Sequence, residues 1–157
     1  MPTISASVVV PARAEEIFDF IADYRNIPVV QPHFTSARLL SHTERGVGAI
    51  VELQGQFHGM PLHVRNRIIT YVPPRRMVSM SDGAVLSRNS WELEPVGDDP
   101  PATRVTFTLD YKMSGALGGL FGGLMAPFFH REMQSLAQQS LTRLRQIFHK
   151  RPEKQVE

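Results

Sequence analysis

The stretch from Phe34 to Met113 does most to limit the folds open to this chain. Turn residues divide it into six short runs rich in Val, Ile, Thr and aromatic residues, which is typical of β-strands. Consecutive strands joined by short turns favour an antiparallel meander. The predicted strands span residues 35–42, 49–57, 62–72, 75–81, 85–95 and 103–113, and the breaks between them fall at 46–48, 59–61, 73–74, 82–83 and 97–101.

The N-terminal segment adds a seventh strand and two short helices. Residues 3–10 alternate, with Ile4, Ala6, Val8 and Val10 on one face, which indicates a half-buried strand. Pro11 ends this strand, and residues 14–23 then carry apolar side chains at helical spacing with acids in the first turn. Prolines limit any second helix, between residues 25 and 31, to one or two turns.

A long amphipathic helix is predicted from about residue 124 to residue 148. The last predicted strand alternates clearly between an apolar and a polar face, so one side of the sheet is dry. We expect the helix to pack on that dry side, which makes the class α+β with about seven strands. Its apolar face consists of Met133, Leu136, Ala137, Ser140, Leu141, Leu144, Ile147 and Phe148.

Composition indicates one folded, soluble domain. The chain has 157 residues, of which 42% are hydrophobic and 20% charged. We expect residues 1–150 to form a single domain and the polar residues 151–157 to be a disordered tail. Cysteine is absent, which excludes a disulfide framework and a thiolate metal site. The N-terminus lacks the pattern of a secretory signal, so the predicted location is the cytoplasm.

Charge and histidine spacing exclude two further classes of function. A net charge of +2 is too small to indicate nucleic-acid binding. The six histidines have no spacing typical of metal ligands, so no metal or cofactor is predicted, and we interpret His130 as a surface residue. Two charged clusters are interpreted as solvated helix faces that match the helix dipoles: Glu15, Glu16, Asp19 and Asp23 near the start, and Arg143, Arg145, Lys150 and Arg151 near the end.

Several local motifs occur in an order that is also found in a known protein superfamily. They read SVVVPARAEEIFDF from Ser7 to Phe20, then IADYRNIP, GVGAIVEL from Gly46 to Leu53, SWELEPVG and TRVTFTLDY. In this order, over about residues 3–148, the chain resembles the START-like or Bet v 1-like superfamily, and in particular its polyketide cyclase/dehydrase and lipid-transport (SRPBCC) branch. The resemblance implies a helix-grip fold whose sheet and long helix enclose a hydrophobic cavity for lipids, polyketides, sterols or quinones. Many relatives carry a Trp before the proline that follows the second helix, whereas this chain has Val-Val-Gln-Pro there. The floor of the cavity is therefore expected to differ from that of these relatives.

Polar residues on dry faces are the candidates for orienting a ligand. Asn66 shares strand parity with Val64 and Ile68, and Asn89 shares it with Trp91, so both amides are expected to point inward. The alternative is that each pairs with backbone at a bulge, or that a bulge turns it to solvent. Tyr111 could donate a hydrogen bond to a ligand carbonyl, although buried tyrosines usually bond within the protein.

The segment from Ser114 to Phe129 contains five glycines and no charge. It lacks the Lys of a phosphate-binding loop, and it is shorter than a membrane span of about 20 residues. We interpret it as an apolar lip over the cavity mouth, formed by Phe121, Met125 and Phe129, which could touch a membrane during lipid loading. The alternatives are a buried loop or a dimer contact.

These features predict a carrier or sequestering protein for a small apolar ligand. We expect no nucleic-acid partner and a transient membrane contact, and the sequence leaves homodimerisation open. The second hypothesis is a cyclase or dehydratase that acts on a polyketide-like or aromatic substrate. A third is a quinone- or membrane-associated helper. The predicted ligand-binding residues are Asn66, Asn89, Trp91, Phe107, Tyr111, Phe121, Met125, Phe129, Met133 and Ala137.

Overall fold

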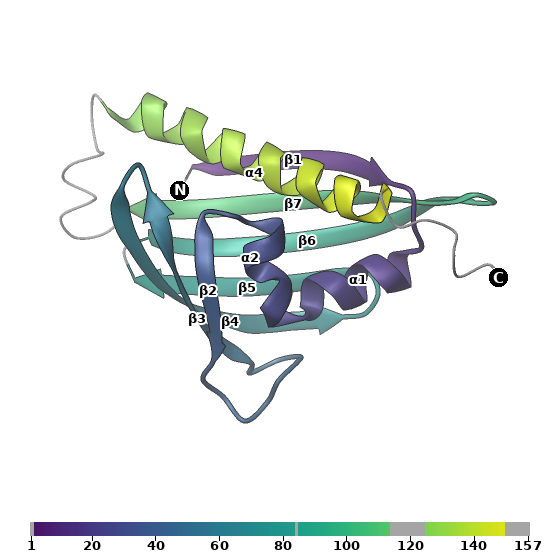
Figure 1. Ribbon diagram of the computed structural model, residues 1–157, viewed down its shortest axis with the longest axis horizontal. Coiled ribbons are helices and arrows are strands. Elements are labelled where there is room, and N and C mark those ends of the chain that lie inside the picture. Colours follow the sequence, from purple (N-terminus) through teal and green to yellow (C-terminus); the bar gives the residue numbers. More distant parts are fainter. Residues whose placement is uncertain (1, 84, 114–124, 150–157) are drawn as a thin grey trace.

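The computed structural model describes residues 2–83, 85–113 and 125–149. Its centre is a seven-stranded sheet with the order β1-β7-β6-β5-β4-β3-β2, in which all neighbours are antiparallel (Figure 1). The meander and the seven strands predicted from the sequence are therefore confirmed. The strands are β1 (Thr3–Val10), β2 (Phe34–Leu39), β3 (Ile50–Phe57), β4 (Met60–Val72), β5 (Arg76–Gly83), β6 (Val85–Asp98) and β7 (Pro101–Met113).

Strands β6 and β7 extend further than predicted. The predicted break at residues 97–101 narrows to two residues, because β6 runs to Asp98 and β7 begins at Pro101. The pairing of β6 with β7 continues across a register shift between Pro95 and Gly97. This shift accommodates the irregular backbone that the glycine and prolines predicted.

Strand β1 closes the sheet against the last strand. The register places Ile4 opposite Leu109 and Ala6 opposite Phe107, so their apolar side chains form one continuous inner face. On the outer face the Ser7 and Thr106 hydroxyls lie 2.7 Å apart. One face of the sheet is therefore dry and the other is polar, as the alternation predicted.

Helix α4 (Ala126–His149) lies along β1 on the dry face of the sheet (Figure 1). The predicted apolar face is confirmed, because its central residues are buried and Met133 and Leu136 pack against the core. Leu144 has 0% of its surface exposed. The buried residues of this face include Ala137, Ser140, Leu141, Leu144 and Phe148.

Three short helical elements cover the same face. Helix α1 (Ala14–Ala22) buries Ile17 and Phe18, and is followed by the 3-10 turn η1 (Tyr24–Asn26) and by α2 (Ile27–Val30). These elements match the predicted helix and the predicted short second helix. Thr103 on β7 fixes the entry to α1, because its hydroxyl donates a hydrogen bond of 2.8 Å to the Ala12 carbonyl.

The core on the dry face is divided into two clusters of buried side chains. The larger joins β1, β6 and β7 to α1 and α4, and the smaller consists of Val51, Leu53 and Val64 on β3 and β4. Within the described ranges, no helix combines the length and hydropathy that a membrane crossing requires.

Candidate ligand cavity

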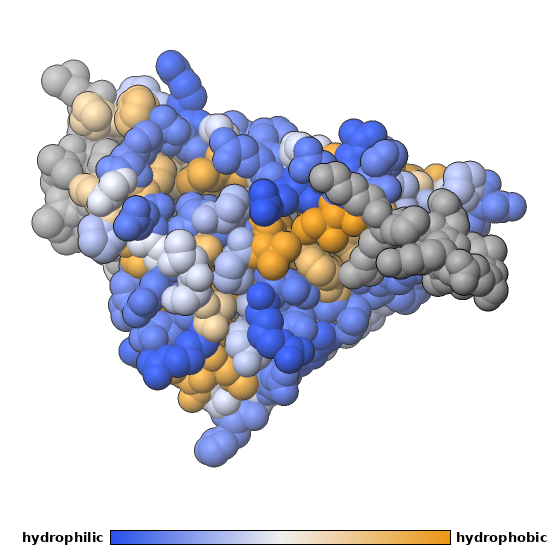
Figure 2. Space-filling view, viewed as in Figure 1, coloured by the Kyte–Doolittle hydropathy of each residue, from blue (hydrophilic) through white to orange (hydrophobic). Residues whose placement is uncertain are grey.

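A cavity of about 170 Å³ lies between the sheet, α4 and the short helices, where the two clusters leave a space. Its volume slightly exceeds that of engineered cavities of about 150 Å³, which bind benzene. On the face shown in Figure 2, hydrophilic residues surround several separate hydrophobic patches. Apolar lining residues include Val51, Leu53, Phe57, Val64, Trp91, Phe107, Leu109, Phe129, Met133, Leu136 and Ala137.

A row of five small polar side chains interrupts this apolar lining. Asn66 comes from β4, Ser79 and Ser81 from β5, and Ser87 and Asn89 from β6. The strand register places Asn66 opposite Ser81, Ser81 opposite Ser87, and Ser79 opposite Asn89. Because all five share the inner face of neighbouring strands, they form one polar patch on the cavity wall, which we call the amide–serine row.

Hydrogen bonds link the members of the amide–serine row. Ser81 Oγ donates to Asn66 Oδ1 at 2.9 Å, and Asn89 Nδ2 contacts the Oγ atoms of Ser81 and Ser87, each at 3.2 Å. The contact from Asn89 Nδ2 to Ser79 Oγ is 3.4 Å. Within the described part of the chain, Asn66 Nδ2 and Asn89 Oδ1 make no hydrogen bond. The row therefore offers both donors and an acceptor to a molecule in the cavity.

The parity argument for the two asparagines is correct. Register shifts occur in their strands at other positions, between Ile68 and Thr70 and between Pro95 and Gly97, so neither amide is turned to solvent. The three serines were missed by the sequence analysis. A signal for them existed in the i, i+2 spacing of Ser79 with Ser81 and of Ser87 with Asn89, which places each pair on one face of its strand.

Five other predicted ligand-binding residues also line the cavity, and three do not belong to its described lining. Trp91, Phe107, Phe129, Met133 and Ala137 all face it. Met125 is 42% exposed and is not part of the lining. Phe121 lies outside the described residues, as does most of the predicted lip.

Tyr111 is buried on the dry face but is not part of the cavity lining. Its hydroxyl lies 3.0 Å from Nδ1 of His130 on α4, and burial raises the pKa of the tyrosine. The alternative considered for Tyr111, a hydroxyl bonded within the protein, is the one observed. The interpretation of His130 as a surface residue is wrong: it is half-buried, because the start of α4 turns its ring towards β7.

His33 also lines the cavity, and the sequence analysis did not select it. It lies in the turn between α2 and β2, and its ring is 4.4 Å from that of Phe34. Nδ1 is buried, and it has no hydrogen-bond partner in the described part of the protein. Burial lowers the pKa of His33 to about 4, so the imidazole is neutral at physiological pH.

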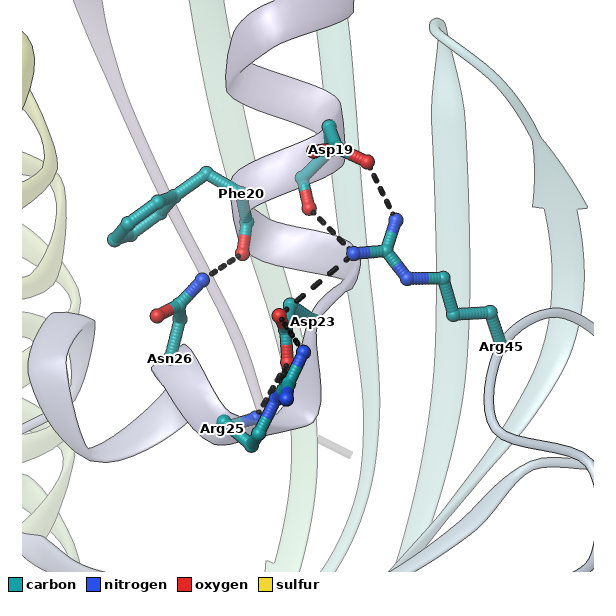
Figure 3. A network of polar contacts seen from close by, with 6 residues as sticks. All are labelled: Asp19, Phe20, Asp23, Arg25, Asn26 and Arg45. Carbon is teal, nitrogen blue, oxygen red and sulfur yellow. Dashed lines mark hydrogen bonds and ion pairs between the residues drawn. The ribbon is translucent and has the colours of Figure 1, made fainter.

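Arg45 lines the cavity from the loop between β2 and β3 and ties that loop to α1 (Figure 3). Its guanidinium contacts Asp19 Oδ1 at 2.6 Å and Asp23 Oδ2 at 3.8 Å. The hydrogen bond from Arg25, together with its nearby charge and that of Arg45, lowers the pKa of Asp23. Asp19 and Asp23 lie at the C-terminal end of α1, where the helix dipole disfavours carboxylates, so the predicted match to the dipole is wrong for these two. Their arginine partners offset that cost.

Full charges are scarce around the cavity. Among the described lining residues only Glu44 and Arg45 are ionised, and Arg45 is already paired with Asp19. No group of three or more His, Asp or Glu side chains gathers in the described ranges to form a metal site. Apart from Glu44 and Arg45, the polar groups in the described lining of the cavity are neutral.

A family model described as polyketide cyclase / dehydrase and lipid transport matches residues 1–148. The chain belongs to this family. Among characterised proteins it is similar to the persistence and stress-resistance toxin PasT of Escherichia coli O6:H1 (strain CFT073), with 26% identity over 118 residues, or 74% of this chain and 72% of PasT.

Several solved structures share the fold. The Zhui aromatase/cyclase from Streptomyces sp. R1128 superimposes with a TM-score of 0.74 at 19% identity, covering 96% of this chain and 94% of Zhui. A START superfamily protein from Mycobacterium smegmatis gives a TM-score of 0.72 at 18% identity, covering 92% of this chain and 98% of that protein. The helix-grip fold expected from the sequence motifs is therefore confirmed.

Proposed function

We propose that this protein binds and carries a small lipophilic molecule in the cavity between the sheet and α4. The observation that carries the proposal is an interior space with an apolar lining and one compact row of hydrogen-bonding groups. Apolar walls supply affinity, at about 25 cal/mol for each Å² of apolar surface removed from water. A few placed polar groups, here the amide–serine row, fix the orientation of the ligand.

The family description supports a lipophilic cargo, since it names lipid transport and polyketide cyclisation. A cyclase or dehydratase is the second candidate. The observation in its favour is the neutral imidazole of His33, which lines the cavity and could accept a proton as a general base. A general base works best when its pKa lies near the working pH, whereas the pKa of His33 is about 4. His33 would therefore be a weak base, and carriage is the better account.

The proposed cellular location rests on the absence of cysteine. A chain without cysteine suits a reducing compartment, and we keep the cytoplasm as the proposed location. Transient membrane contact and homodimerisation remain predictions.

A naphthalene-type fluorescent probe tests the proposal. The wild type should bind it with one-to-one stoichiometry. Ala137 is 3% exposed and faces the cavity, so Ala137→Trp should fill the space and abolish binding, at a stability cost of about 1 to 3 kcal/mol. Gln138→Trp adds the same ring to the exposed face of α4 and should bind like the wild type.

Native mass spectrometry of freshly purified protein should detect a co-purified apolar adduct in the wild type. The same adduct should be missing from Ala137→Trp. A wild type that binds no apolar probe, or an Ala137→Trp variant that binds as well as the wild type, would show that the cavity is not a binding site.

A further inference from the structure

Ser81 joins the two asparagines of the amide–serine row in a fixed direction. Asn89 Nδ2 donates to Ser81 Oγ at 3.2 Å, and Ser81 Oγ donates to Asn66 Oδ1 at 2.9 Å. Asn89 thereby holds Ser81, and Ser81 holds the amide of Asn66. Because a hydroxyl group has one proton, Ser81 cannot donate to both amides at once. The row therefore has two unlike ends, a free N–H group on Asn66 and a free carbonyl oxygen on Asn89.

The two ends stay unlike when the amide groups rotate. If both amides turn by 180°, Asn66 donates to Ser81 and Ser81 donates to Asn89, so the free N–H group and the free oxygen exchange places. Turning only one amide either sets two oxygens against the single serine proton or leaves that proton without an acceptor among the three groups. Both satisfied arrangements present one donor end and one acceptor end.

Both free ends open into the cavity. Asn66 and Asn89 belong to interior strands that are paired on both sides, and their side chains line the cavity. Both residues are only half-buried. In the described ranges, His33 Nδ1 is the sole fully buried side-chain polar atom without a partner, so the free atoms of the two amides keep accessible surface. A molecule in the cavity can therefore reach them without displacing a protein group.

The strand spacing separates the two free ends. Asn66 is on β4 and Asn89 is on β6, with β5 between them. Neighbouring strands lie about 4.8 Å apart, so the two backbones are about 10 Å apart. Each amide reaches inwards to Ser81 on the middle strand, and the free ends lie on opposite sides of that residue. Groups that bond both ends must therefore sit at separate positions of a ligand, not on a single carboxyl or amide group.

The rest of the lining narrows the ligand class. Helix α4 contributes Met133, Leu136 and Ala137, which have no hydrogen-bonding side chain, so the ligand is apolar where it meets these residues. Burying a carboxylate without a cation is strongly unfavourable, and Arg45 is already paired with Asp19. The volume of about 170 Å³ favours a compact ring system over a long chain.

Resting on the proposed function, we infer that the amide–serine row selects neutral ring molecules that carry a hydrogen-bond acceptor and a hydrogen-bond donor at separate positions along one edge. In the observed direction, Asn66 Nδ2 donates to the acceptor, such as a ketone, and Asn89 Oδ1 accepts from the donor, such as a hydroxyl group. Ser81 is a positioning residue, because it sets this direction through its contacts with the two amides.

Isomeric hydroxyketones of naphthalene test the ligand class at neutral pH, by competition with the fluorescent probe. 6-Acetyl-2-naphthol carries its two groups on different rings and should bind the wild type about five- to tenfold more tightly than 2-acetylnaphthalene or 2-naphthol. In 3-acetyl-2-naphthol the same groups are neighbours and hydrogen-bond to each other, so this isomer should bind within about twofold of naphthalene. 2-Naphthoate should bind most weakly.

Variants of the row test the residues. Asn66→Leu removes one end, so it should lose the gain in affinity from one group, the acetyl group in the observed direction, and keep the gain from the hydroxyl group. Ser81→Ala should reduce both gains, because the two amides lose their shared partner, and Ser81→Thr keeps the hydroxyl and should restore them. Ser90→Ala, on the outer face of β6, should preserve both gains. Naphthalene affinity within about twofold of the wild type shows that a variant retains the cavity.

The outcomes separate this inference from the proposed function. If naphthalene and all its derivatives fail to bind the wild type, the proposed function itself fails. If they bind but 6-acetyl-2-naphthol is no tighter than its 3-acetyl isomer, carriage stands and the ligand class is overturned. If Asn66→Leu and Ser81→Ala weaken naphthalene and the hydroxyketone alike, the role of the row in selection is overturned. Tighter binding of 2-naphthoate than of 2-naphthol would overturn the restriction to neutral molecules.

Discussion

Gly55 lies against the backbone of His33 so closely that a Cβ atom at position 55 would stand 2.0 Å from the His33 carbonyl oxygen. The neighbouring Gln56 N–H donates its hydrogen bond to that same oxygen. Strand β3 therefore requires glycine here because of the close approach of the turn before β2. The approach therefore fixes the backbone of His33, whose side chain lines the cavity.

Gly55→Ala should destabilise the protein by about 2 kcal/mol or more, because the added methyl group overlaps backbone that cannot rotate away. Denaturant unfolding measures the change. Gly97→Ala is the comparison variant: its Cβ would lie 3.3 Å from the Pro100 carbonyl oxygen, a tight contact but a much milder one, so it should cost clearly less. Equal losses in the two variants would show that the contact with His33 is not the cause.

Asn89→Leu should reduce affinity for 2-acetylnaphthalene by about five- to tenfold while affinity for naphthalene changes little, because the row then loses its central amide. Ser90→Ala lies next along β6 with the opposite parity and serves as the control. Competition with the fluorescent probe gives both affinities. A parallel loss for the ketone and the hydrocarbon would mean that the row shapes the cavity without orienting the ligand.

Leu144→Asp should lower the free energy of unfolding by about 3 kcal/mol or more, because Leu144 is fully buried and the new carboxylate would lack a partner. Thr142→Asp places the same charge on the exposed face of α4 and should change stability by less than about 0.5 kcal/mol. Thermal melting compares the three proteins. A melting temperature for Leu144→Asp close to that of the wild type would contradict the packing of α4.

His33 should make stability depend on pH between about 6.5 and about 4. Burial lowers its pKa from 6.5 to about 4, so in this range the unfolded chain binds a proton that the folded protein does not. The free energy of unfolding should therefore fall as the pH falls, by up to about 3 kcal/mol from this group, and the contribution is fully present above about pH 6.5.

Urea unfolding of the wild type and of His33→Phe at about pH 7 and about pH 4.5 measures that contribution. The variant lacks the titrating group, so its stability should fall less over this interval. Identical losses in the two proteins would show that folding does not lower the pKa of His33.

Much of the fold could be predicted because it depends on local periodicity. Alternation of period two along residues 103–113 and helical spacing along residues 124–148 assign an inner face to each element without knowledge of its partner. Trp91, Phe107, Met133 and Ala137 were placed on inner faces by this rule, and all four line the cavity. The same rule correctly put Tyr111 on the dry face of the sheet, but it could not show that Tyr111 lies outside the lining of the cavity.

The sequence by itself determined the order of the elements and which of their faces are apolar, because both follow from neighbours a few residues away, whereas the observed strand registers were needed to show that Asn66 and Asn89 point inward. Tertiary structure decided that β1 pairs with β7, that three serines join the two amides, that Tyr111 meets His130, and that His33 enters the cavity wall. These features join residues that are distant in the chain, and His33 lies in a turn. A turn has no period that assigns a side chain to a face, so only the tertiary structure could place that ring.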